Sequence, residues 1–269
     1  MTPSPYWKLV LIPRSVVPVV LAATLSQGVA AQSPINIDQL LAKASTWQVS
    51  SSFDYRATSF TSLQRDRRAT FSTGIRYGLT PRFELNGRFT ASEQRQEFAG
   101  LEFRQKTQGA SLGANWLIKP ESALPALLLE ARAVVHRNGS VSRRSLPEWR
   151  LGVTTYKSLD PVVLSLSAAM TLQRDYQLAE GSVEPGMAWR VEPGVNFAVN
   201  ANVTLFGGVS FERRNASSAN GESLADQSER VGIRGGIALA IARRHSVFVS
   251  GDIASDHQGG MNLQWFYEF

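Results

Sequence analysis

The amino-acid sequence predicts an all-β protein, a transmembrane antiparallel β-barrel of about 12 strands preceded by a short N-terminal helix or extended segment. Three observations support this: apolar and polar side chains alternate along most of the chain, short and long connections alternate between the strands, and the last residue is aromatic. A period of two indicates strands with one apolar and one polar face. No apolar run reaches the roughly 18 residues of a membrane helix, which leaves strands to cross the bilayer.

The first 31 residues indicate a secretory signal peptide. Lys8 and Arg14 supply positive charge, Val16–Leu25 forms an apolar core, and Val29-Ala30-Ala31 is a small-residue cleavage site. This pattern is typical of a leader and too short for a membrane span. We therefore expect the protein in the bacterial cell outer membrane after signal-peptide removal.

The rest of the chain is expected to have two parts. Residues 32–46 form an N-terminal periplasmic or plug segment, within which Ser33–Ser45 is the one helical candidate. The same stretch is also compatible with a disordered lead-in to the first strand. Residues 47–269 form the outer-membrane β-barrel.

Twelve segments show the alternation, and each is near the length that a tilted strand needs to cross the hydrocarbon. An even number of strands is typical of bacterial outer-membrane barrels. The segments are Trp47–Ser59, Arg68–Leu79, Phe83–Thr90, Thr107–Ile118, Ala126–Arg137, Glu148–Leu159, Val162–Gln173, Met187–Val199, Val203–Glu212, Arg230–Ile241, Ser246–Ile253 and Met261–Phe269.

The connections alternate between short and long without a break. The short ones are Leu79–Arg82, Ile118–Pro125, Lys157–Pro161, Asn200–Asn202 and Ala242–His245. The mostly longer, polar ones are Phe60–Arg67, Ser92–Lys106, Asn138–Pro147, Arg174–Gly186, Arg213–Glu229 and Ala254–Gly260. Tight periplasmic turns and larger outer loops are typical of outer-membrane barrels, and this order leaves both ends of the barrel domain on the periplasmic side.

The alternation also separates lipid-facing from lumen-facing residues. The set expected to face lipid includes Leu112, Ala114, Trp116, Leu127, Leu129, Ala131, Val195, Phe197, Val199, Val231, Ile233 and Ile237. The lumen and selectivity candidates are Asp54, Arg56, Arg68, Arg76, Glu84, Arg88, Glu130, Arg132, Arg150, Arg190, Glu192 and Arg234, with Asp252 on the same wall. Arginine outnumbers the acidic residues in this set, which favours anionic or aromatic solutes. Twelve strands enclose a backbone radius of about 12 Å, so the lumen is either a narrow pore or closed by cross-strand salt bridges.

Met261–Phe269 alternates as the last strand, with Phe266 as the one exception. A strand that ends in Phe resembles the closing strand of outer-membrane barrels, in which the aromatic terminus is the assembly signal. Here Trp265, Tyr267 and Phe269 match that signal. We therefore expect outer-membrane lipid and the barrel-assembly machinery as partners, the latter through this strand.

Three stretches resemble one family. They are YGLTPRFEL (Tyr77–Leu85), SLDPVVL (Ser158–Leu164) and EPGVNFAVNANVTLFGGVSFE (Glu192–Glu212). In this order they are similar to turns of the outer-membrane transporter family assigned to the phenol meta-pathway, and of the related functional-amyloid export pore. Pro81 departs from the pattern, because an acidic residue is usual there, and no long coiled coil precedes the barrel. The resemblance implies an outer-membrane barrel over residues 47–269.

The sequence lacks the patterns typical of disulfide-bonded proteins, metal sites, nucleic-acid-binding proteins and hydrolases of this membrane. The chain has no cysteine, which excludes disulfides and thiolate metal sites. The arginines alternate with apolar residues instead of clustering, which argues against nucleic acid as a partner. None of His136, His245 and His257 forms a His-x-Ser pair on one strand face, as a hydrolase of this membrane needs. We therefore predict no enzyme, no catalytic residue, no metal site and no cofactor.

The favoured function is that of an outer-membrane β-barrel channel or transporter-like protein for passive passage of small, anionic or aromatic solutes. Two alternatives stay open. The barrel is an export pore or accessory for a secreted peptide or amyloid subunit, or it is a structural or adhesive barrel with a closed lumen. The remaining partner is therefore an unknown small solute or an exported peptide.

Overall fold

The computed structural model describes residues 41–61, 64–98, 101–138, 142–174, 176–178, 181–184, 186–219 and 222–269. The predicted signal peptide and most of Ser33–Ser45 lie outside the described residues. The described end of that stretch, from Leu41 on, is bend, turn and bridge and not helix. Within this part of the chain, no helix has the length and hydropathy of a membrane span.

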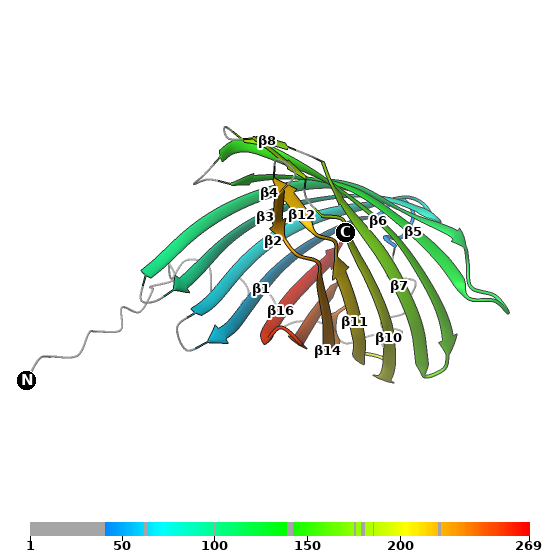
Figure 1. Cartoon of the computed structure of the whole chain (residues 1–269). Coiled ribbons are helices and arrows are strands. Elements are labelled where there is room, and N and C mark those ends of the chain that lie inside the picture. Colours follow the sequence, from blue (N-terminus) through cyan, green and yellow to red (C-terminus); the bar gives the residue numbers. More distant parts are fainter. Residues whose placement is uncertain are drawn as a thin grey trace, which may run out of the picture. The chain divides into compact units, whose positions relative to one another are not determined.

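Twelve antiparallel strands form a closed barrel in the order β1-β16-β15-β14-β11-β10-β7-β6-β5-β4-β3-β2 (Figure 1). Closure gives every barrel strand two neighbours and leaves no free edge. The predicted fold class and strand number are therefore confirmed. The strands are β1 (Trp47–Thr61), β2 (Gln64–Thr80), β3 (Phe83–Phe98), β4 (Leu101–Lys119), β5 (Ala126–Asn138), β6 (Ser142–Leu159), β7 (Val162–Gln173), β10 (Ala188–Asn200), β11 (Val203–Arg214), β14 (Ser228–Ala242), β15 (His245–Ala254) and β16 (Gln258–Glu268).

The observed strands match the predicted ones at the periplasmic turns but extend further at the outer ends. β7 has the predicted bounds Val162–Gln173. In contrast, most of the predicted loops Phe60–Arg67, Ser92–Lys106 and Asn138–Pro147 is strand. Beyond the hydrocarbon both faces of a strand meet water, so the apolar alternation fades although the backbone hydrogen bonds continue.

Two outer loops form a second, four-stranded sheet that the sequence analysis did not predict. Its order is β13-β12-β9-β8, and β12 pairs with β9, so the sheet joins the two loops. Strands of three or four residues are too short to show a recognisable alternation. The four are β8 (Tyr176–Leu178), β9 (Gly181–Glu184), β12 (Ser217–Ala219) and β13 (Glu222–Ala225).

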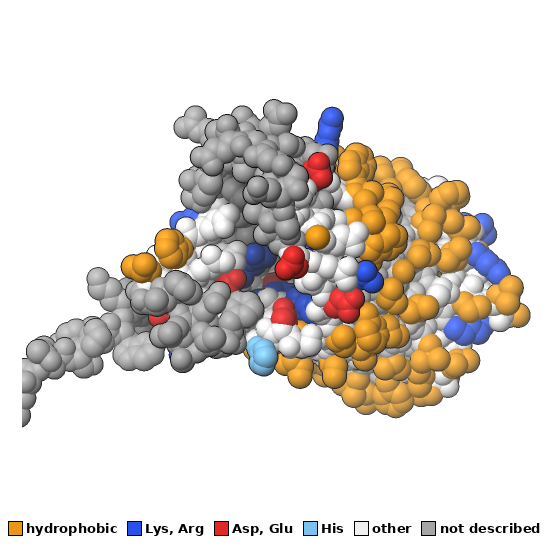
Figure 2. Space-filling view, viewed as in Figure 1, with side chains coloured by type: hydrophobic (Ala, Val, Ile, Leu, Met, Phe, Trp, Pro, Cys, Tyr) orange, Lys and Arg blue, Asp and Glu red, His pale blue; other side chains and the backbone are white. Residues whose placement is uncertain are grey.

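Large apolar side chains lie on the outer surface of the barrel. Leu112 is 74% exposed, Ile233 59% and Val195 41%, although each lies within a regular strand. Figure 2 shows a broad apolar surface over the strands, with acidic and basic side chains gathered in the hollow at the centre of the view. Exposed apolar surface on this scale is unfavourable in water and favourable against lipid.

Aromatic rings line the rim of this surface at the end of the barrel that carries the short turns. Trp47 packs on Tyr77 with ring centroids 4.4 Å apart, and Tyr267 lies 6.2 Å from Trp265 and 4.7 Å from Phe269. The Phe269 N–H donates to the Trp47 carbonyl at 2.9 Å. The last residue therefore takes part in the seam between β16 and β1, at the depth where aromatic girdles contact the membrane–water interface.

Glu121 links two neighbouring short turns. Its carboxylate accepts hydrogen bonds from the Ser158 N–H and Oγ, each at 2.8 Å, and lies 3.4 Å from the Lys157 ammonium. Burial acts to raise the pKa of Glu121, but the hydrogen bonds from Ser158 and Lys157 outweigh it and lower the pKa below its ordinary value. The link therefore stabilises the fold above the ordinary carboxyl pKa and is lost as the pH falls through the lowered one.

Candidate functional site

The candidate functional site is the inner wall of the barrel. Residues paired across neighbouring strands share a face, so Arg76 lies on the same wall as Gln48 and Asn86, whereas Trp47 and Tyr77 pair on the lipid side. This register places every predicted selectivity candidate on the inner wall: Asp54, Arg56, Arg68, Arg76, Glu84, Arg88, Glu130, Arg132, Arg150, Arg190, Glu192 and Arg234, with Asp252 beside them. Their part in selecting solutes stays a prediction.

Further charged residues lie on the inner wall and were missing from the predicted set. They include Asp66, Glu148, Glu212 and Arg230, with Arg214 and Glu268 near the strand ends. Each lies near, at or beyond the predicted end of its strand, so continuing the two-residue alternation identifies them. Since four of these six are acidic, the excess of arginine on the wall is smaller than the predicted set indicated.

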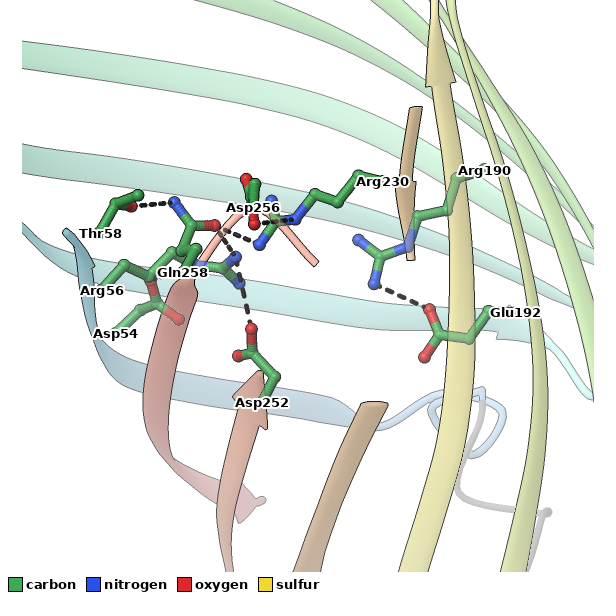
Figure 3. A network of polar contacts seen from close by, with 9 residues as sticks. All are labelled: Asp54, Arg56, Thr58, Arg190, Glu192, Arg230, Asp252, Asp256 and Gln258. Atoms are coloured by element: carbon green, nitrogen blue, oxygen red, sulfur yellow. Dashed lines mark hydrogen bonds and ion pairs between the residues drawn. The ribbon is translucent and has the colours of Figure 1, made fainter. Parts of the chain in front are cut away.

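The wall formed by β14, β15, β16 and β1 carries a network of polar contacts (Figure 3). Arg56 Nε lies 3.1 Å from Asp54 Oδ1, and Arg56 Nη1 lies 3.8 Å from Asp252 Oδ2. Gln258 Oε1 accepts hydrogen bonds from Arg56, at 3.4 Å, and from Arg230. Both guanidinium groups therefore have partners within the wall itself.

A second cluster of charged side chains joins β10 to β14. The Glu192 carboxylate contacts Arg190 Nη2 at 3.0 Å through one oxygen and Arg234 through the other. Figure 3 shows Arg190 and Glu192 directed from β10 toward the same interior space as Arg230. One carboxylate thus contacts two arginines that come from different strands.

The wall formed by β2 to β6 carries three arginine–carboxylate pairs, with N···O distances of 2.5 to 3.1 Å: Arg76–Glu84, Arg132–Glu130 and Arg150–Glu148. Arg68 and Asp66 also lie on this wall, and both contact the side chain of Gln94. Arg88 forms no hydrogen bond or ion pair with the part of the chain that the structure describes. Among the described side chains, five arginines and four carboxylates leave this wall with one positive charge in excess.

Glu84 has no exposed surface and anchors the N-terminal segment to the barrel. Its carboxylate accepts hydrogen bonds from Arg76 Nε and Nη2 at 2.9 and 2.6 Å, and from Asn115 Nδ2 at 3.0 Å. The backbone N–H of Ala42 donates to the same carboxylate at 2.5 Å. Because Glu84 faces the lumen, the chain at Ala42 lies against the inner wall.

Leu41–Thr46 follows this wall past Gly78. The Ser45 N–H donates to the Gly78 carbonyl at 2.7 Å, and the Gly78 N–H donates to the Thr46 carbonyl at 3.2 Å. A Cβ at Gly78 would lie 2.1 Å from the backbone oxygen of Lys43. The close approach therefore depends on the absence of a side chain at this position.

We expect Gly78→Ala to displace Leu41–Thr46 and to leave the barrel closed, because the added methyl group meets backbone atoms of that segment. Trypsin cleavage after Lys43 in detergent-solubilised protein measures the displacement, and the rate should rise roughly tenfold. Gly87→Ala is the control, since its Cβ finds no atom closer than 3.6 Å. Equal cleavage rates in the two variants would contradict this account of the segment.

Three phenylalanines lie on the inner wall near the ends of their strands that carry the short turns. Phe248 is 6.5 Å from Phe206 and 5.1 Å from Phe266, measured between ring centroids. A Cβ at Gly236 would lie 2.5 Å from the Phe206 ring, so glycine there makes room for the ring. The apparent exception Phe266 therefore belongs to an apolar patch of the lumen, which the sequence analysis did not identify.

Neither described histidine side chain forms a hydrogen bond with a serine or threonine hydroxyl. His245 is on the lipid face, where its Nδ1 accepts a hydrogen bond from Trp265 Nε1 at 3.3 Å, whereas Ser246 faces the lumen. His257 occupies a turn with φ of 58°. The side chain of His136 lies outside the described part. Among the described residues no group of three or more potential metal ligands occurs.

No family model and no curated protein matches the chain. Solved structures match it by fold. A crystal structure of an outer membrane channel from Pseudomonas putida F1 is 12% identical with a TM-score of 0.66, covering 84% of this chain and 96% of that one. The β domain of the Bordetella autotransporter BrkA is 13% identical with a TM-score of 0.60, covering 84% and 100%. The translocator domain of the autotransporter NalP from Neisseria meningitidis is 11% identical with a TM-score of 0.56, covering 84% and 89%.

Likenesses at this level of identity show the fold alone. The resemblance to the phenol meta-pathway transporter family and to the amyloid export pore therefore stays a prediction. What the neighbours have in common is the type of barrel. The chain has the fold of the outer-membrane β-barrels, with 12 antiparallel strands closed between β1 and β16.

Proposed function

We propose that the protein is a narrow channel of the bacterial outer membrane through which small solutes pass passively. The observation that supports it best is a closed barrel with an apolar outer surface and a charged inner wall. Lipid solvates such an exterior, and a polar interior accommodates water and polar solutes. The likeness in fold to the outer membrane channel from Pseudomonas putida F1 adds support.

The solute class we propose is anionic or aromatic. The uncompensated charge at Arg88 supports the first property, because a fixed cation on a pore wall attracts anions. The lumen patch of Phe206, Phe248 and Phe266 supports the second, because aromatic faces stack on one another. An arginine that contacts a carboxylate contributes less net field than Arg88 does.

Conductance across planar lipid bilayers tests the channel. We expect discrete current steps in potassium chloride and, under a salt gradient, a reversal potential that indicates preference for chloride. Protein denatured by heat before addition serves as the control. Silence at every salt concentration and voltage would reject the channel and favour the structural or adhesive barrel with a closed lumen.

Export of a secreted peptide or amyloid subunit is the second candidate. The fold likeness to the β domain of BrkA, at a TM-score of 0.60, supports it. Leu41–Thr46 partly occupies the lumen at its periplasmic end, so export requires this segment to move before a peptide can pass. Accumulation of a secreted cargo inside a strain that lacks this protein would support export, and normal secretion would reject it.

We further propose that the barrel-assembly machinery recognises the terminal strand through Trp265, Tyr267 and Phe269. Deletion of Phe269 removes the hydrogen bond to the Trp47 carbonyl and the ring contact with Tyr267. We expect the folded, heat-modifiable form in the outer membrane to fall severalfold, with protein retained in the periplasm. Phe269→Tyr is the matched control, because it preserves the aromatic terminus. Normal assembly of the deletion variant would contradict the proposal.

A further inference from the structure

Arg88, Asn86 and Arg132 lie together on the inner wall. Asn86 and Arg88 are two residues apart on β3 and therefore point the same way. Asn86 pairs with Gly113 of β4, which in turn pairs with Arg132 of β5. Gly113 therefore lies between Asn86 and Arg132 on the wall. Because it has no side chain, nothing at this position holds Asn86 and Arg132 apart.

Glycines form the floor beneath these side chains. A Cβ at Gly113 would lie 2.8 Å from Asn86 Oδ1 and 3.4 Å from the Arg132 Cβ, so Asn86 and Arg132 approach each other over this position. A Cβ at Gly74 would lie 3.8 Å from Arg88 Nε. The three donor side chains therefore lie beside two positions of the wall, Gly74 and Gly113, that carry no side chain.

Several donor groups of this cluster have no acceptor. Asn86 Nδ2 and Arg132 Nε are buried and form no hydrogen bond within the described residues. Arg88 has no partner there either, whereas Arg132 reaches Glu130 through Nη2 at 3.1 Å. Unpaired donors are unfavourable in a folded protein, and such donors gathered at one place indicate an absent acceptor.

We propose that Asn86, Arg88 and Arg132 form a subsite for the carboxylate group of a small monoanionic solute, an inference that rests on the proposed channel function and narrows its solute class. A guanidinium presents two parallel N–H donors that match the two oxygens of a carboxylate. The Asn86 amide and Arg132 supply further donors. One surplus positive charge on this wall is neutralised by one carboxylate, whereas a doubly charged phosphate would leave a negative charge in excess.

Butyrate and its uncharged analogue butyramide are the probes for the full-length mature protein. Potassium butyrate flux across planar bilayers should saturate with concentration in the wild type. In Arg88→Gln the half-saturating concentration should rise about tenfold, which corresponds to 1.4 kcal/mol. Arg88→Lys keeps the positive charge but lacks the planar guanidinium group, and should raise the half-saturating concentration roughly threefold. Butyramide permeation in proteoliposomes should be the same in all variants.

Arg104→Gln is the matched control, because it also removes one positive charge. Arg104 is an exposed residue of β4 whose guanidinium contacts Glu102 at 2.7 Å. The variant should leave the butyrate dependence unchanged. Two results overturn the subsite but not the channel. One is a butyrate flux that rises in proportion to concentration in the wild type, and the other is an equal half-saturating concentration in Arg88→Lys and the wild type. Absence of current in every salt rejects the channel itself. In that event, saturation-transfer NMR with butyrate in detergent decides the subsite separately, because loss of signal in Arg88→Gln supports it and an equal signal overturns it.

Discussion

Replacement of Glu84 by Ala is expected to lower the free energy of unfolding of the barrel by about 3–5 kcal/mol, because it removes the buried carboxylate of an ion pair whose arginine is also largely buried. Glu84 has no exposed surface, and the side chain of Arg76 is 17% exposed. The substitution also removes the acceptor of the Ala42 N–H. Urea-dependent unfolding in phospholipid vesicles, followed by tryptophan fluorescence, measures the change. Trypsin cleavage after Lys43 should accelerate in parallel.

The matched control is Glu93→Ala. Glu93 also pairs with an arginine, Arg95, at 2.8 Å, but the two side chains are 32% and 46% exposed. Solvent screens such a pair, so its removal should leave the unfolding midpoint unchanged. Similar midpoints for Glu84→Ala and Glu93→Ala would show that the buried carboxylate does not stabilise the barrel more than a surface one.

Leu166→Arg is expected to destabilise the membrane-inserted barrel by about 2–4 kcal/mol, because it places a charge against the hydrocarbon. Leu166 lies in the middle of β7 and is 47% exposed. In a soluble protein the same exposed position would tolerate arginine with little effect. Folding into phospholipid vesicles at increasing urea concentration measures the cost.

Ser167→Arg supplies the control on the next residue of the same strand. Ser167 faces the lumen opposite Glu192, so the new guanidinium meets water and a carboxylate. We expect a change within about 1 kcal/mol. An equal cost at both positions, or a larger one at Ser167, would mean that the assigned lipid and lumen faces are reversed or that lipid does not surround the barrel.

The strand number and the two faces could be predicted from the sequence, because both are local properties. A slip of one residue moves every apolar side chain of a strand to the other face, so lipid on one side forces a regular pattern. β7 shows this most clearly, since its predicted and observed bounds coincide. Past Thr90 the pattern fades because water replaces lipid, and the extension of β3 to Phe98 was therefore missed.

The arrangement of charges within the lumen could be predicted only in part. Alternation identified Arg88 and Arg76 as inward, but the carboxylate that Arg76 contacts lies on the next strand. Arg76 meets Glu84 because β2 and β3 pair in one register, and Arg88 lies opposite Ser111 and Gly74, which offer no carboxylate. Other pairs are local, since Arg132–Glu130 and Arg150–Glu148 each join residues two apart on one strand face.

By itself, the sequence determined which side chains contact lipid and which face the lumen, since apolar and polar residues alternate along each strand. Only the tertiary structure decided that Arg76 meets Glu84, that Phe266 joins Phe206 and Phe248 inside, and that the chain around Ala42 binds Glu84. The reason is physical: these contacts join different strands or segments, and the register in which these pair decides which residues meet.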